Sequence, residues 1–530
     1  MIAFPLPAPA DPAAEVPALL AVLAETHPTM ALAMVHALSG ADSPALRATG
    51  HRLVEALAAD SLLDQDVDAV VSRAHKALAA FENWTDQRID ALLFDIATLL
   101  AGRAEELAIA AVSETGLGNV ADKTLKIRFA SLGIYRSLAG QIAQGVIAVD
   151  EERRVTEIAS PVGVVFAIAP VTNPVATAIF KMLIAIKGRN ATILSFHHQA
   201  LGVGQLTCGI VRDALKAHGA PADLVQWVHH PNRKVTRRFM AHQGVSLVLA
   251  TGGQSLVQAA YSSGTPAIGV GPGNAPAWIC PDADLGAAAR AIVGSKTFDN
   301  GVICGAEHNL VVDAGVADPF VEALIAEGAA ILTPEETRRF AAQTIDPKTG
   351  SLRHDIVGQS ATTIAAAVGV VRAYPIRLLI VPAVFPGLGG FPSEAARALD
   401  RFNTGEKLAP VLSMFTVDGE DEGLQRCQAL LAIAGAGHTA VIHSTNPARV
   451  ERFARVIRAG RILVNSPAAQ GCCGMTTGLA CSMTLGCGTF GGNSTTDNVT
   501  FRHLLNVKRV AYPLEAISVA RSANASADRR

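Results

Sequence analysis

The chain has 530 residues, which is too long for one compact core, so we expect two or more domains. Charged residues make up 17% of it and apolar residues 50%, a balance that indicates a globular protein and argues against a disordered one. The formal net charge of −2 and the lack of a basic run argue against a nucleic-acid surface.

Residues 1–60 are rich in alanine and proline, and their apolar pattern, as in VPALLAVLAETHP, predicts an N-terminal helical appendage. The start of the chain lacks the basic and the long apolar segments of a secretory signal. Nowhere does the chain approach the ~20 uninterrupted apolar residues of a membrane-spanning helix. We therefore expect a cytoplasmic protein without membrane contact.

Helical and strand patterns follow each other in the next part of the chain. From about 68 to 143, apolar residues recur at spacings of three and four and predict long helices. VGVVFAIAP (162–170) predicts a buried strand, and Pro174 suits the first position of a helix that runs to about Lys187. Further strands are expected at 191–196, 224–229 and 246–250, with helices at 201–219 and 235–242. This alternation predicts an α/β fold with a parallel, doubly wound sheet of nucleotide-binding type, although the first strand–helix turn lacks G-x-G-x-x-G.

Four local sequences contain residues of the types that take part in catalysis or ligand binding. They are APVTNPVATAIFK around Asn173, GVGPGNAPAWICPDAD from Gly269, SKTFDNGVICGAEHNLVV around Cys304 and GEKLAPVLSMF around Glu406. Taken singly, each has an ordinary explanation: an asparagine before proline is a common turn residue, and a cysteine is most often a small core residue. Their combination, in this order, is more informative than any one of them.

Together these motifs resemble the aldehyde dehydrogenase superfamily, and most closely its CoA-acylating branch. That branch includes the acetaldehyde-forming half of the bifunctional aldehyde–alcohol dehydrogenases and the acylating propionaldehyde and sulfoacetaldehyde dehydrogenases. The resemblance runs from about residue 70 to 512, includes the late segments AGHTAVIHS and GCGTFGGNS, and leaves the first ~65 residues outside.

The resemblance implies an aldehyde dehydrogenase fold of three parts. A doubly wound nucleotide-binding domain is expected over 61–268 and an α/β catalytic domain over 269–460. A small β oligomerisation arm is expected near 140–157. It is completed by residues 461–515, which also close the active site, and residues 516–530 form a tail. A homodimer or homotetramer is then expected.

The resemblance also assigns roles to individual residues. Cys304 is the expected nucleophile, whose thiolate adds to an aldehyde and then holds the acyl group as a thioester. The Asn173 side-chain amide and the Cys304 backbone N–H would stabilise the oxyanion of that adduct. Glu406, in its E-x-x-x-P-V context, would hold the nicotinamide ribose. His438 would help catalysis, with a satisfied core histidine as the alternative. The other residues expected at the cofactor are Thr172, Ser195, His197, Gly252 and Gly253.

The identity of the dinucleotide stays open at this point. After the second strand, relatives often use lysine and glutamate to grip the adenine ribose. This chain has the sequence Ser195-Phe196-His197-His198 there, with no carboxylate to repel a 2′-phosphate. The expected cofactor is therefore NAD or NADP, with coenzyme A as co-substrate.

The residue at position 270 distinguishes the CoA-acylating branch from the hydrolytic aldehyde dehydrogenases. Hydrolytic aldehyde dehydrogenases have a water-activating glutamate there, and this chain has Val270, which cannot act as a base. The expected reaction is aldehyde + CoA + NAD(P)⁺ to acyl-CoA + NAD(P)H, in either direction. The alternatives are a hydrolytic enzyme that gives a free carboxylate and a catalytically silent scaffold member. Sulfonated, hydroxylated and plain short-chain aldehydes are all compatible with the sequence.

The remaining features have modest interpretations. The eight cysteines are scattered without paired CxxC units, so reduced thiols and no metal site are expected. Cys472 and Cys473 lie between glycines, which favours a packing role in a tight loop. The amphipathic stretch 14–25 is interpreted as a dimer contact or a tail, with a peptide that targets a microcompartment shell as the alternative.

Overall fold

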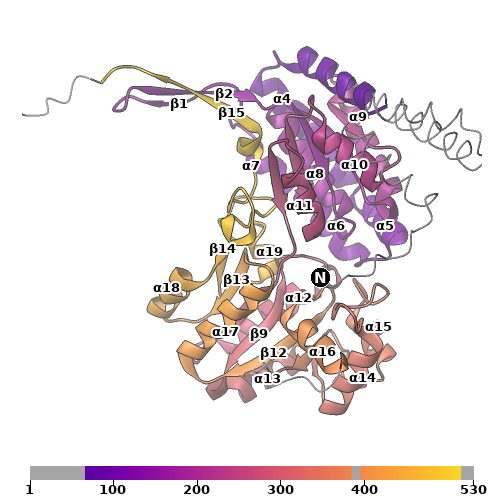
Figure 1. Ribbon diagram of the computed structural model, residues 1–530, viewed down its shortest axis with the longest axis vertical. Helices are drawn as coiled ribbons and strands as arrows, with labels where there is room; N and C mark the ends of the chain where they lie inside the picture. Colours follow the sequence, from indigo (N-terminus) through magenta and orange to yellow (C-terminus); the bar gives the residue numbers. More distant parts are fainter. Residues whose placement is uncertain (1–65, 385–393, 515–530) are drawn as a thin grey trace, which may run out of the picture. The chain divides into compact units, whose positions relative to one another are not determined.

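The computed structural model describes residues 66–384 and 394–514, which form a mixed α/β structure (Figure 1). Contacts divide the chain into two units, residues 1–70 and 71–530, and the elements named below belong to the second. The expected appendage over 1–60, including the stretch 14–25, and the expected tail over 516–530 lie outside the described residues. None of the described helices is long and apolar enough to cross a membrane.

Helices predominate at the start of the second unit, as the spacing of apolar residues predicts. After a helix that ends at residue 81, the elements are α4 (Asp86–Gly102), α5 (Ala104–Thr115), α6 (Val120–Arg128) and α7 (Ile134–Leu138), with a π-helical turn at Phe129–Gly133. α4 buries Ile89, Leu92 and Ile96 along one stripe. The Thr85 hydroxyl caps this helix by accepting a hydrogen bond from the Arg88 N–H.

The first parallel sheet has five strands in the order β5-β4-β3-β6-β7. Its strands are β3 (Val164–Ile168), β4 (Ala191–Ser195), β5 (Val225–Trp227), β6 (Leu247–Thr251) and β7 (Ala267–Val270). The helices between them are α8 (Pro174–Lys187), α9 (Leu201–Ala217), α10 (Arg233–Ala241) and α11 (Gln254–Tyr261). The strand order reverses between β3 and β6, and the carboxyl ends at such a switch point are where doubly wound sheets bind ligands. The predicted doubly wound sheet is confirmed, and α8 has the predicted bounds.

α8 is buried along its whole length. It contacts α4, α9 and the π-helical turn, and it also contacts β3 and β4 of the sheet. The alanine, isoleucine, leucine and phenylalanine content of PVATAIFKMLIAIK suits a helix surrounded on all sides. The loop before α8, which contains Asn173, is therefore fixed to a rigid element.

The second parallel sheet has seven strands in the order β10-β11-β12-β9-β8-β13-β14. Its strands are β8 (Ala275–Ile279), β9 (Glu307–Asp313), β10 (Ala329–Ile331), β11 (Leu378–Pro382), β12 (Val411–Val417), β13 (Gly437–His443) and β14 (Ala459–Val464). The accompanying helices are α12 (Leu285–Thr297), α13 (Ala317–Ala326), α14 (Pro334–Thr344), α15 (Ala361–Ala367), α16 (Glu394–Thr404), α17 (Gly419–Ile433), α18 (Pro447–Val456) and α19 (Ala468–Gly471). Both faces of this sheet are covered: Ala277 and Ile279 of β8 pack in one core with Leu310, whereas Trp278 packs in another with Phe415.

The two parallel sheets are joined by a short connection that positions the site. β7 ends at Val270 and β8 begins at Ala275. The loop after β3 also reaches the segment before β9, because the Asn173 side-chain amide donates to the Val302 carbonyl (3.0 Å). The carboxyl ends of the first sheet therefore meet the segments that lead into the second. The domain boundaries given above stay a prediction.

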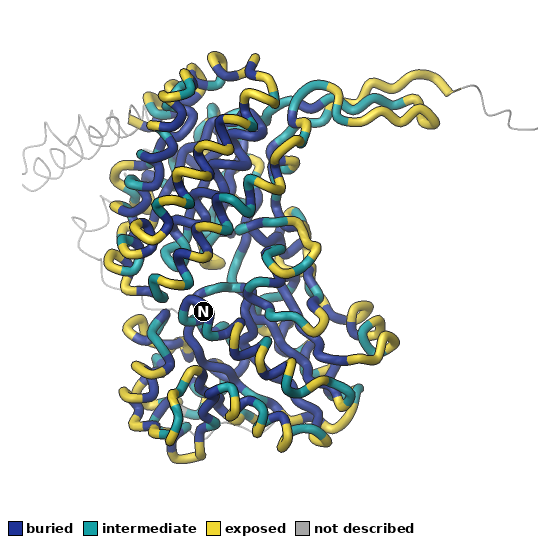
Figure 2. The backbone as a smooth tube through the Cα atoms, turned by 180° about the vertical axis from the view of Figure 1, so that it is seen from behind, coloured by how far each residue is buried: buried dark blue, intermediate teal, exposed yellow. Residues whose placement is uncertain are grey.

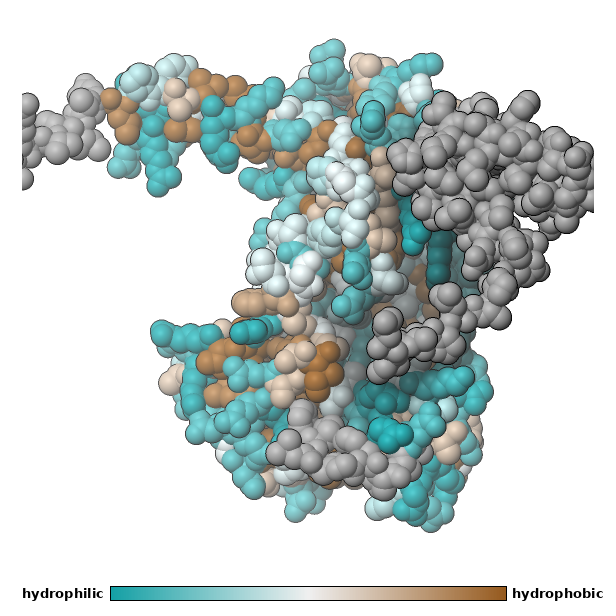
Figure 3. All heavy atoms as spheres, in the orientation of Figure 1, coloured by the Kyte–Doolittle hydropathy of each residue, from teal (hydrophilic) through white to brown (hydrophobic). Residues whose placement is uncertain are grey.

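The third sheet is antiparallel and consists of β1 (Gly145–Asp150), β2 (Val155–Pro161) and β15 (Leu505–Ala511) in the order β1-β2-β15. β15 pairs with β2 from Leu505 opposite Pro161 to Ala511 opposite Val155. Residues along these strands are mostly half-buried or exposed (Figure 2). Hydrophobic side chains nevertheless lie on their surface (Figure 3), and Val146 and Val149 are each more than half exposed, at 52% and 54%.

Candidate active site

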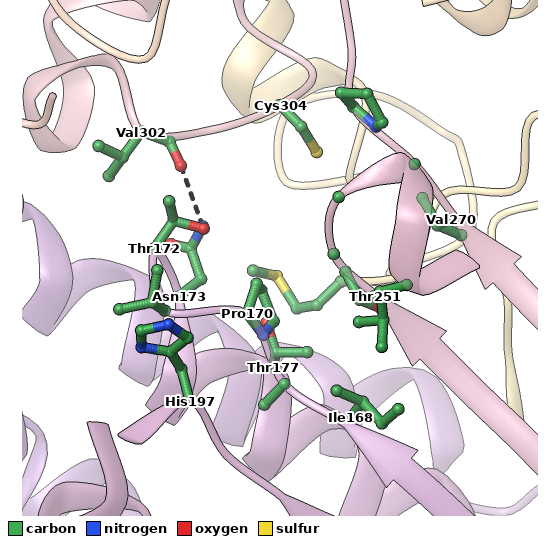
Figure 4. Close-up of a pocket in the computed structure, with 18 of the residues that line it drawn as sticks. Ile168, Pro170, Thr172, Asn173, Thr177, His197, Thr251, Val270, Val302 and Cys304 are labelled. Carbon is green, nitrogen blue, oxygen red and sulfur yellow. Dashed lines mark hydrogen bonds between the residues drawn. The ribbon is translucent and has the colours of Figure 1, made fainter. Parts of the chain in front are cut away.

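A cavity of about 850 Å³ lies between the loops that follow the five-stranded sheet and those that precede the seven-stranded sheet. In Figure 4, Thr172, Asn173 and His197 lie on one side of it and Cys304 and Val270 on the other. Eight of the nine residues predicted for the site line this cavity, namely Thr172, Asn173, Ser195, His197, Gly252, Gly253, Cys304 and Glu406. The ninth, His438, does not line it.

Cys304 lies between a left-handed turn and β9. Its backbone packs closely against Gly273, where a Cβ atom would overlap the Cys304 carbonyl oxygen. The residue is half-buried. Burial, and next the charge of Glu406, raise the pKa of the Cys304 thiol to about 12. The thiol is therefore protonated at neutral pH in this arrangement, and bound positive charge or a proton acceptor would promote the reactive thiolate.

Asn173 is the N-cap residue of α8, yet its side chain makes no capping hydrogen bond. An asparagine at this position ordinarily accepts a hydrogen bond from the first turn of its helix. Here its Oδ1 accepts a hydrogen bond from Lys126 Nζ, while its Nδ2 donates to the Val302 carbonyl at 3.0 Å (Figure 4). The amide is thus turned away from the helix and toward the segment that contains the cysteine.

Glu406 lies close to Cys304 and is fixed by the chain that joins the two sheets. Its Oε1 accepts a hydrogen bond from the Gly273 N–H at 3.0 Å. Burial raises the pKa of the Glu406 carboxyl to about 7, although this hydrogen bond and Lys296 oppose the shift. Among the described residues that line the cavity, Glu406 is the only carboxylate.

Buried groups behind the site support the Glu406 segment. His308 Nδ1 accepts a hydrogen bond from the Lys407 N–H at 2.8 Å, and Lys296 Nζ donates to the Lys407 carbonyl at 2.6 Å. Burial lowers the pKa of Lys296 to about 7. These residues could not be predicted from the sequence, because nothing in their local pattern distinguishes a buried lysine from a solvated one.

The lining of the cavity also contains groups suited to phosphate. Gly253 is the N-cap of α11, no side chain in the described part of the protein caps this helix, and a Cβ atom on Gly253 would meet no described atom within 4 Å. The amino end of a helix attracts anions because its first N–H groups are free and its dipole is positive there. His197, Arg233 and Arg237 line the same cavity. Burial and next His198 lower the pKa of His197, which favours its neutral form.

His438 lies on β13 and is completely buried. Its Nδ1 is 2.9 Å from the Thr439 hydroxyl, and its Nε2 has no hydrogen-bond partner among the described residues. Burial and next Arg461 lower the pKa of His438 to about 3, so the ring is neutral. A Cβ atom on Gly305 would lie 3.5 Å from the His438 ring, which places the ring beside the residue after Cys304. Its catalytic role stays a prediction.

Two other features noted in the sequence also reach the cavity. Val270, at the end of β7, is buried and lines the cavity with its apolar side chain. Cys472 and Cys473 line it as well, and each thiol donates to the Ala469 carbonyl at 3.6 Å. Burial raises the pKa of Cys473 to about 11, and that of Cys472 lies well above its ordinary value. Both thiols are therefore protonated at neutral pH in this arrangement, as the Cys304 thiol is.

Comparison with known proteins identifies the relatives of this chain. The model of the aldehyde dehydrogenase family matches residues 47–345. This match begins before the start near residue 70 that the motifs indicated, so the expectation that the first ~65 residues lie outside the family is wrong for residues 47–65. Residues 47–65 contain no recognisable motif of the family.

Curated relatives match most of the chain. Aldehyde-alcohol dehydrogenase 2 of Entamoeba histolytica is 38% identical over 459 residues, which are 85% of this chain and 52% of the relative. This chain thus spans about half the length of the aldehyde–alcohol dehydrogenases that it matches. Sulfoacetaldehyde dehydrogenase (acylating) of Cupriavidus necator is 38% identical over 457 residues, which are 84% of this chain and 89% of the relative.

A solved structure shows the same fold. The acetylating aldehyde dehydrogenase of Geobacillus thermoglucosidasius superimposes with a TM-score of 0.81 at 39% identity. The superposition covers 86% of this chain and 98% of that one.

Proposed function

Because this chain belongs to the aldehyde dehydrogenase family, we propose that it is a CoA-acylating aldehyde dehydrogenase that converts an aldehyde, CoA and NAD(P)⁺ to an acyl-CoA and NAD(P)H. Two of the relatives described above bear the words acylating or acetylating in their names.

One observation in the cavity supports acyl transfer to CoA over hydrolysis. A hydrolytic enzyme needs a base that activates water beside the thioester. Val270 occupies the position expected for that base, and its buried side chain cannot accept a proton. Glu406 is the only carboxylate that lines the described cavity, and its Oε1 is engaged by the Gly273 N–H. A thioester on Cys304 should therefore react only slowly with water and should persist until a thiol attacks it.

The chain's own residues supply the covalent steps. The Cys304 thiolate attacks the aldehyde carbon, and the resulting oxyanion accepts hydrogen bonds from the Asn173 amide and the Cys304 N–H. A nicotinamide bound in this cavity supplies the acceptor for the hydride that leaves the adduct, which then becomes the Cys304 thioester. The CoA thiolate attacks this thioester, the bond to the Cys304 sulfur breaks, and the enzyme thiolate is regenerated as acyl-CoA departs.

The described residues fit a dinucleotide. The uncapped start of α11 at Gly252 and Gly253 would hold phosphate, and Ser195, Thr172 and His197 line the adjacent wall. Glu406 would hold the nicotinamide ribose. Arg233 and Arg237 add positive charge to a cavity with a single carboxylate, which suits both NADP and the phosphates of CoA.

The test compares product formation with and without CoA. Acyl-CoA and free carboxylate are measured separately while NAD(P)H is followed, using a panel of short-chain aldehydes. We expect sustained turnover only with CoA and, without it, a single-turnover burst that leaves an acyl adduct on Cys304, detected by mass spectrometry. Free acid released as fast without CoA as acyl-CoA forms with it would establish hydrolysis instead.

Two variants separate chemistry from binding. Cys304→Ala should abolish acyl transfer while NAD(P)⁺ still binds, because its binding groups are elsewhere in the cavity. The control is Cys481→Ala, which changes a half-buried thiol that does not line this cavity. An acyl adduct on Cys472 or Cys473 in the parent enzyme would contradict the assignment of Cys304.

We also propose that the three-stranded sheet contacts a second copy of the chain. Val146 and Val149 of β1 are about half exposed, and Val510 of β15 is 38% exposed. Apolar side chains grouped on exposed strands mark contact surfaces. Replacing Val146 and Val149 by lysine should lower the oligomeric state in sedimentation equilibrium, and an unchanged state would refute this contact.

A further inference from the structure

A buried cluster of charges lies directly behind Asn173. Lys126 donates to both the Asn173 Oδ1 and the Asp299 Oδ2. Lys123 donates to the same Asp299 oxygen at 3.0 Å and to the Thr172 carbonyl at 3.2 Å. Asp299 is fully buried, and each lysine is only 3% exposed. Buried charges at this depth cost stability unless they are paired, as they are here.

Asp299 also fixes the turn that precedes Cys304. Asp299 (φ 51°, ψ 41°) and Asn300 (φ 52°, ψ 33°) both lie in the left-handed region, where a non-glycine residue costs roughly 1–2 kcal/mol. The Asp299 Oδ1 accepts a hydrogen bond from the Asn119 N–H at 2.9 Å, and the Asp299 N–H donates to Asp122 at 2.8 Å. Such a conformation persists only where its surroundings enforce it.

A glycine opposite the turn makes room for this carboxylate. A Cβ atom on Gly118 would overlap the Asp299 Oδ1, and Gly118 itself has a φ of +77°. The loop between α5 and α6 is therefore shaped to receive Asp299. Four segments meet at this carboxylate: the loop between α5 and α6, α6 with its lysines, the Thr172–Asn173 loop through those lysines, and the turn before Cys304.

The orientation of the Asn173 amide follows from these contacts. A lysine ammonium only donates hydrogen bonds, so the atom that faces Lys126 must be the amide oxygen. The NH₂ group then faces the Val302 carbonyl, two residues before Cys304, to which it donates at 3.0 Å. Without Lys126, only the Val302 carbonyl would hold the amide in this orientation, and an amide that turned over would present its oxygen, which would repel an oxyanion.

We propose that Lys126 and Asp299 are positioning residues for the oxyanion site: Lys126 holds the Asn173 amide with its NH₂ group toward the segment that contains Cys304, and Asp299 ties that lysine to the turn that precedes Cys304. This rests on the proposed function, in which Asn173 donates to the oxyanion. Loss of one oxyanion donor typically lowers kcat by ~10²–10³, and loss of its orientation should lower kcat by at least ~10-fold.

The experiment is a double-mutant cycle of Lys126→Met and Asn173→Ala, measured as kcat with CoA, NAD(P)⁺ and the short-chain aldehyde that the parent oxidises fastest. We expect each single variant to lower kcat, with little change in the Kd of NAD(P)⁺ measured by fluorescence. In the Asn173→Ala background, Lys126→Met should cause almost no further loss, because Lys126 acts through Asn173. Lys126→Arg, which keeps a charged donor, should recover part of kcat.

The matched control is Lys187→Met. Lys187 is also a buried lysine paired with an aspartate, Asp90, but neither residue lines the cavity. Lys187→Met should lower the melting temperature, as we also expect for Lys126→Met, but it should leave kcat unchanged. Where Lys126→Met does not fold, Gly118→Ala displaces the Asp299 carboxylate without removing a charge and should also lower kcat.

The outcomes separate this proposal from the one it rests on. An unchanged kcat in Asn173→Ala would overturn the role of Asn173 and the positioning role with it. A low kcat in Asn173→Ala together with an unchanged kcat in Lys126→Met would overturn the positioning role alone. Fully multiplicative losses in the double variant would also overturn it, since Lys126 would then act independently of Asn173.

Discussion

Gly273 packs so closely against Cys304 that a methyl group on its Cα would overlap the Cys304 carbonyl oxygen. The Gly273 N–H also donates to the Glu406 carboxylate. We expect Gly273→Ala to displace the backbone of Cys304 and to lower kcat by at least ~10²-fold, because the Cys304 N–H is an oxyanion donor. Steady-state kinetics and thermal unfolding measure the two effects.

The control for that substitution is Gly294→Ala. Gly294 lies inside α12, and a Cβ atom there meets no other atom within 4 Å. Alanine in an open helical position should stabilise the protein by about 0.4–1 kcal/mol. Equal kcat values for the two variants would contradict the close contact.

The charge of Glu406 contributes to the raised pKa of the Cys304 thiol. This charge is the second cause, after burial, of the rise in the Cys304 pKa to about 12. Glu406→Gln should therefore lower that pKa and speed the alkylation of Cys304 by iodoacetamide at a fixed pH near 8, because a drop of one unit gives about tenfold more thiolate. The rate is measured by mass spectrometry of the Cys304 peptide.

The pH dependence of Cys304 alkylation gives a second test of the effect of Glu406. Glu406 has a pKa of about 7, so it gains its charge as pH rises from 6 to 8 and opposes the ionisation of the thiol. In the parent, alkylation should rise by less than ~10-fold per pH unit in this range, whereas in Glu406→Gln it should rise by the full factor. Parallel profiles would refute the electrostatic link.

Arg372 stabilises the protein through Glu336, the N3 residue of α14. The guanidinium donates to both carboxylate oxygens at 2.8 Å and, as the largest cause, lowers the Glu336 pKa to about 2. The pKa of Glu336 is lower in the folded state than in the unfolded state, where it is ~4.3. Its ionisation therefore stabilises the folded protein above pH ~4.3, and this stabilisation is lost as pH falls toward 2. Glu336→Gln should cost about 1–2 kcal/mol at pH 7. In urea unfolding, its difference from the parent should shrink between pH 4 and 2.

The neighbouring Glu335 provides the comparison. It pairs with Arg339 on the exposed face of the same helix, where its side chain is 71% exposed. Glu335→Gln should change stability by less than ~1 kcal/mol, because exposed pairs contribute little. A pH-independent loss in Glu336→Gln would show that its ion pair does not provide the stabilisation.

The fold was predictable where local pattern and local structure coincide. The helix from Pro174 to Lys187 has the predicted bounds because proline and the apolar run define it locally. α10 begins at Arg233, before the predicted residue 235, because the Asn232 side chain caps it by accepting the Val235 N–H. The strand predicted at 224–229 is shorter, since only Val225–Trp227 pairs with β4.

The site was predictable only for residues within recognisable motifs. Cys304, Asn173 and Glu406 stand in such motifs, and the structure brings them to one cavity. Lys126 and Asp299 were missed because their pairing joins residues far apart in the chain, and a helical lysine is ordinarily solvated. A signal did exist: Lys123 and Lys126 are three residues apart, which places both on one face of α6 beside buried Ile127.

The identity of residue 270 should determine which nucleophile releases the acyl group. General-base assistance typically accelerates attack by ~10²–10⁴-fold, so its absence at Val270 should suppress hydrolysis by about that factor. A thiol with a pKa near 8.5 is already a few per cent thiolate at neutral pH and needs less assistance. Val270→Glu should therefore raise the rate of carboxylate formation without CoA.

The same variant should lower the CoA-dependent rate. The new carboxylate would stand at the end of β7, inside the cavity, where it would repel anionic CoA and crowd its thiol. Glutamine is nearly the same size as glutamate but has neither its charge nor its basicity. Val270→Gln should therefore crowd CoA but not accelerate hydrolysis. Carboxylate and acyl-CoA are measured at steady state in all three enzymes, with and without CoA. If Val270→Gln releases carboxylate as fast as Val270→Glu, the gain comes from water entry and not from a base, and the assignment of position 270 fails.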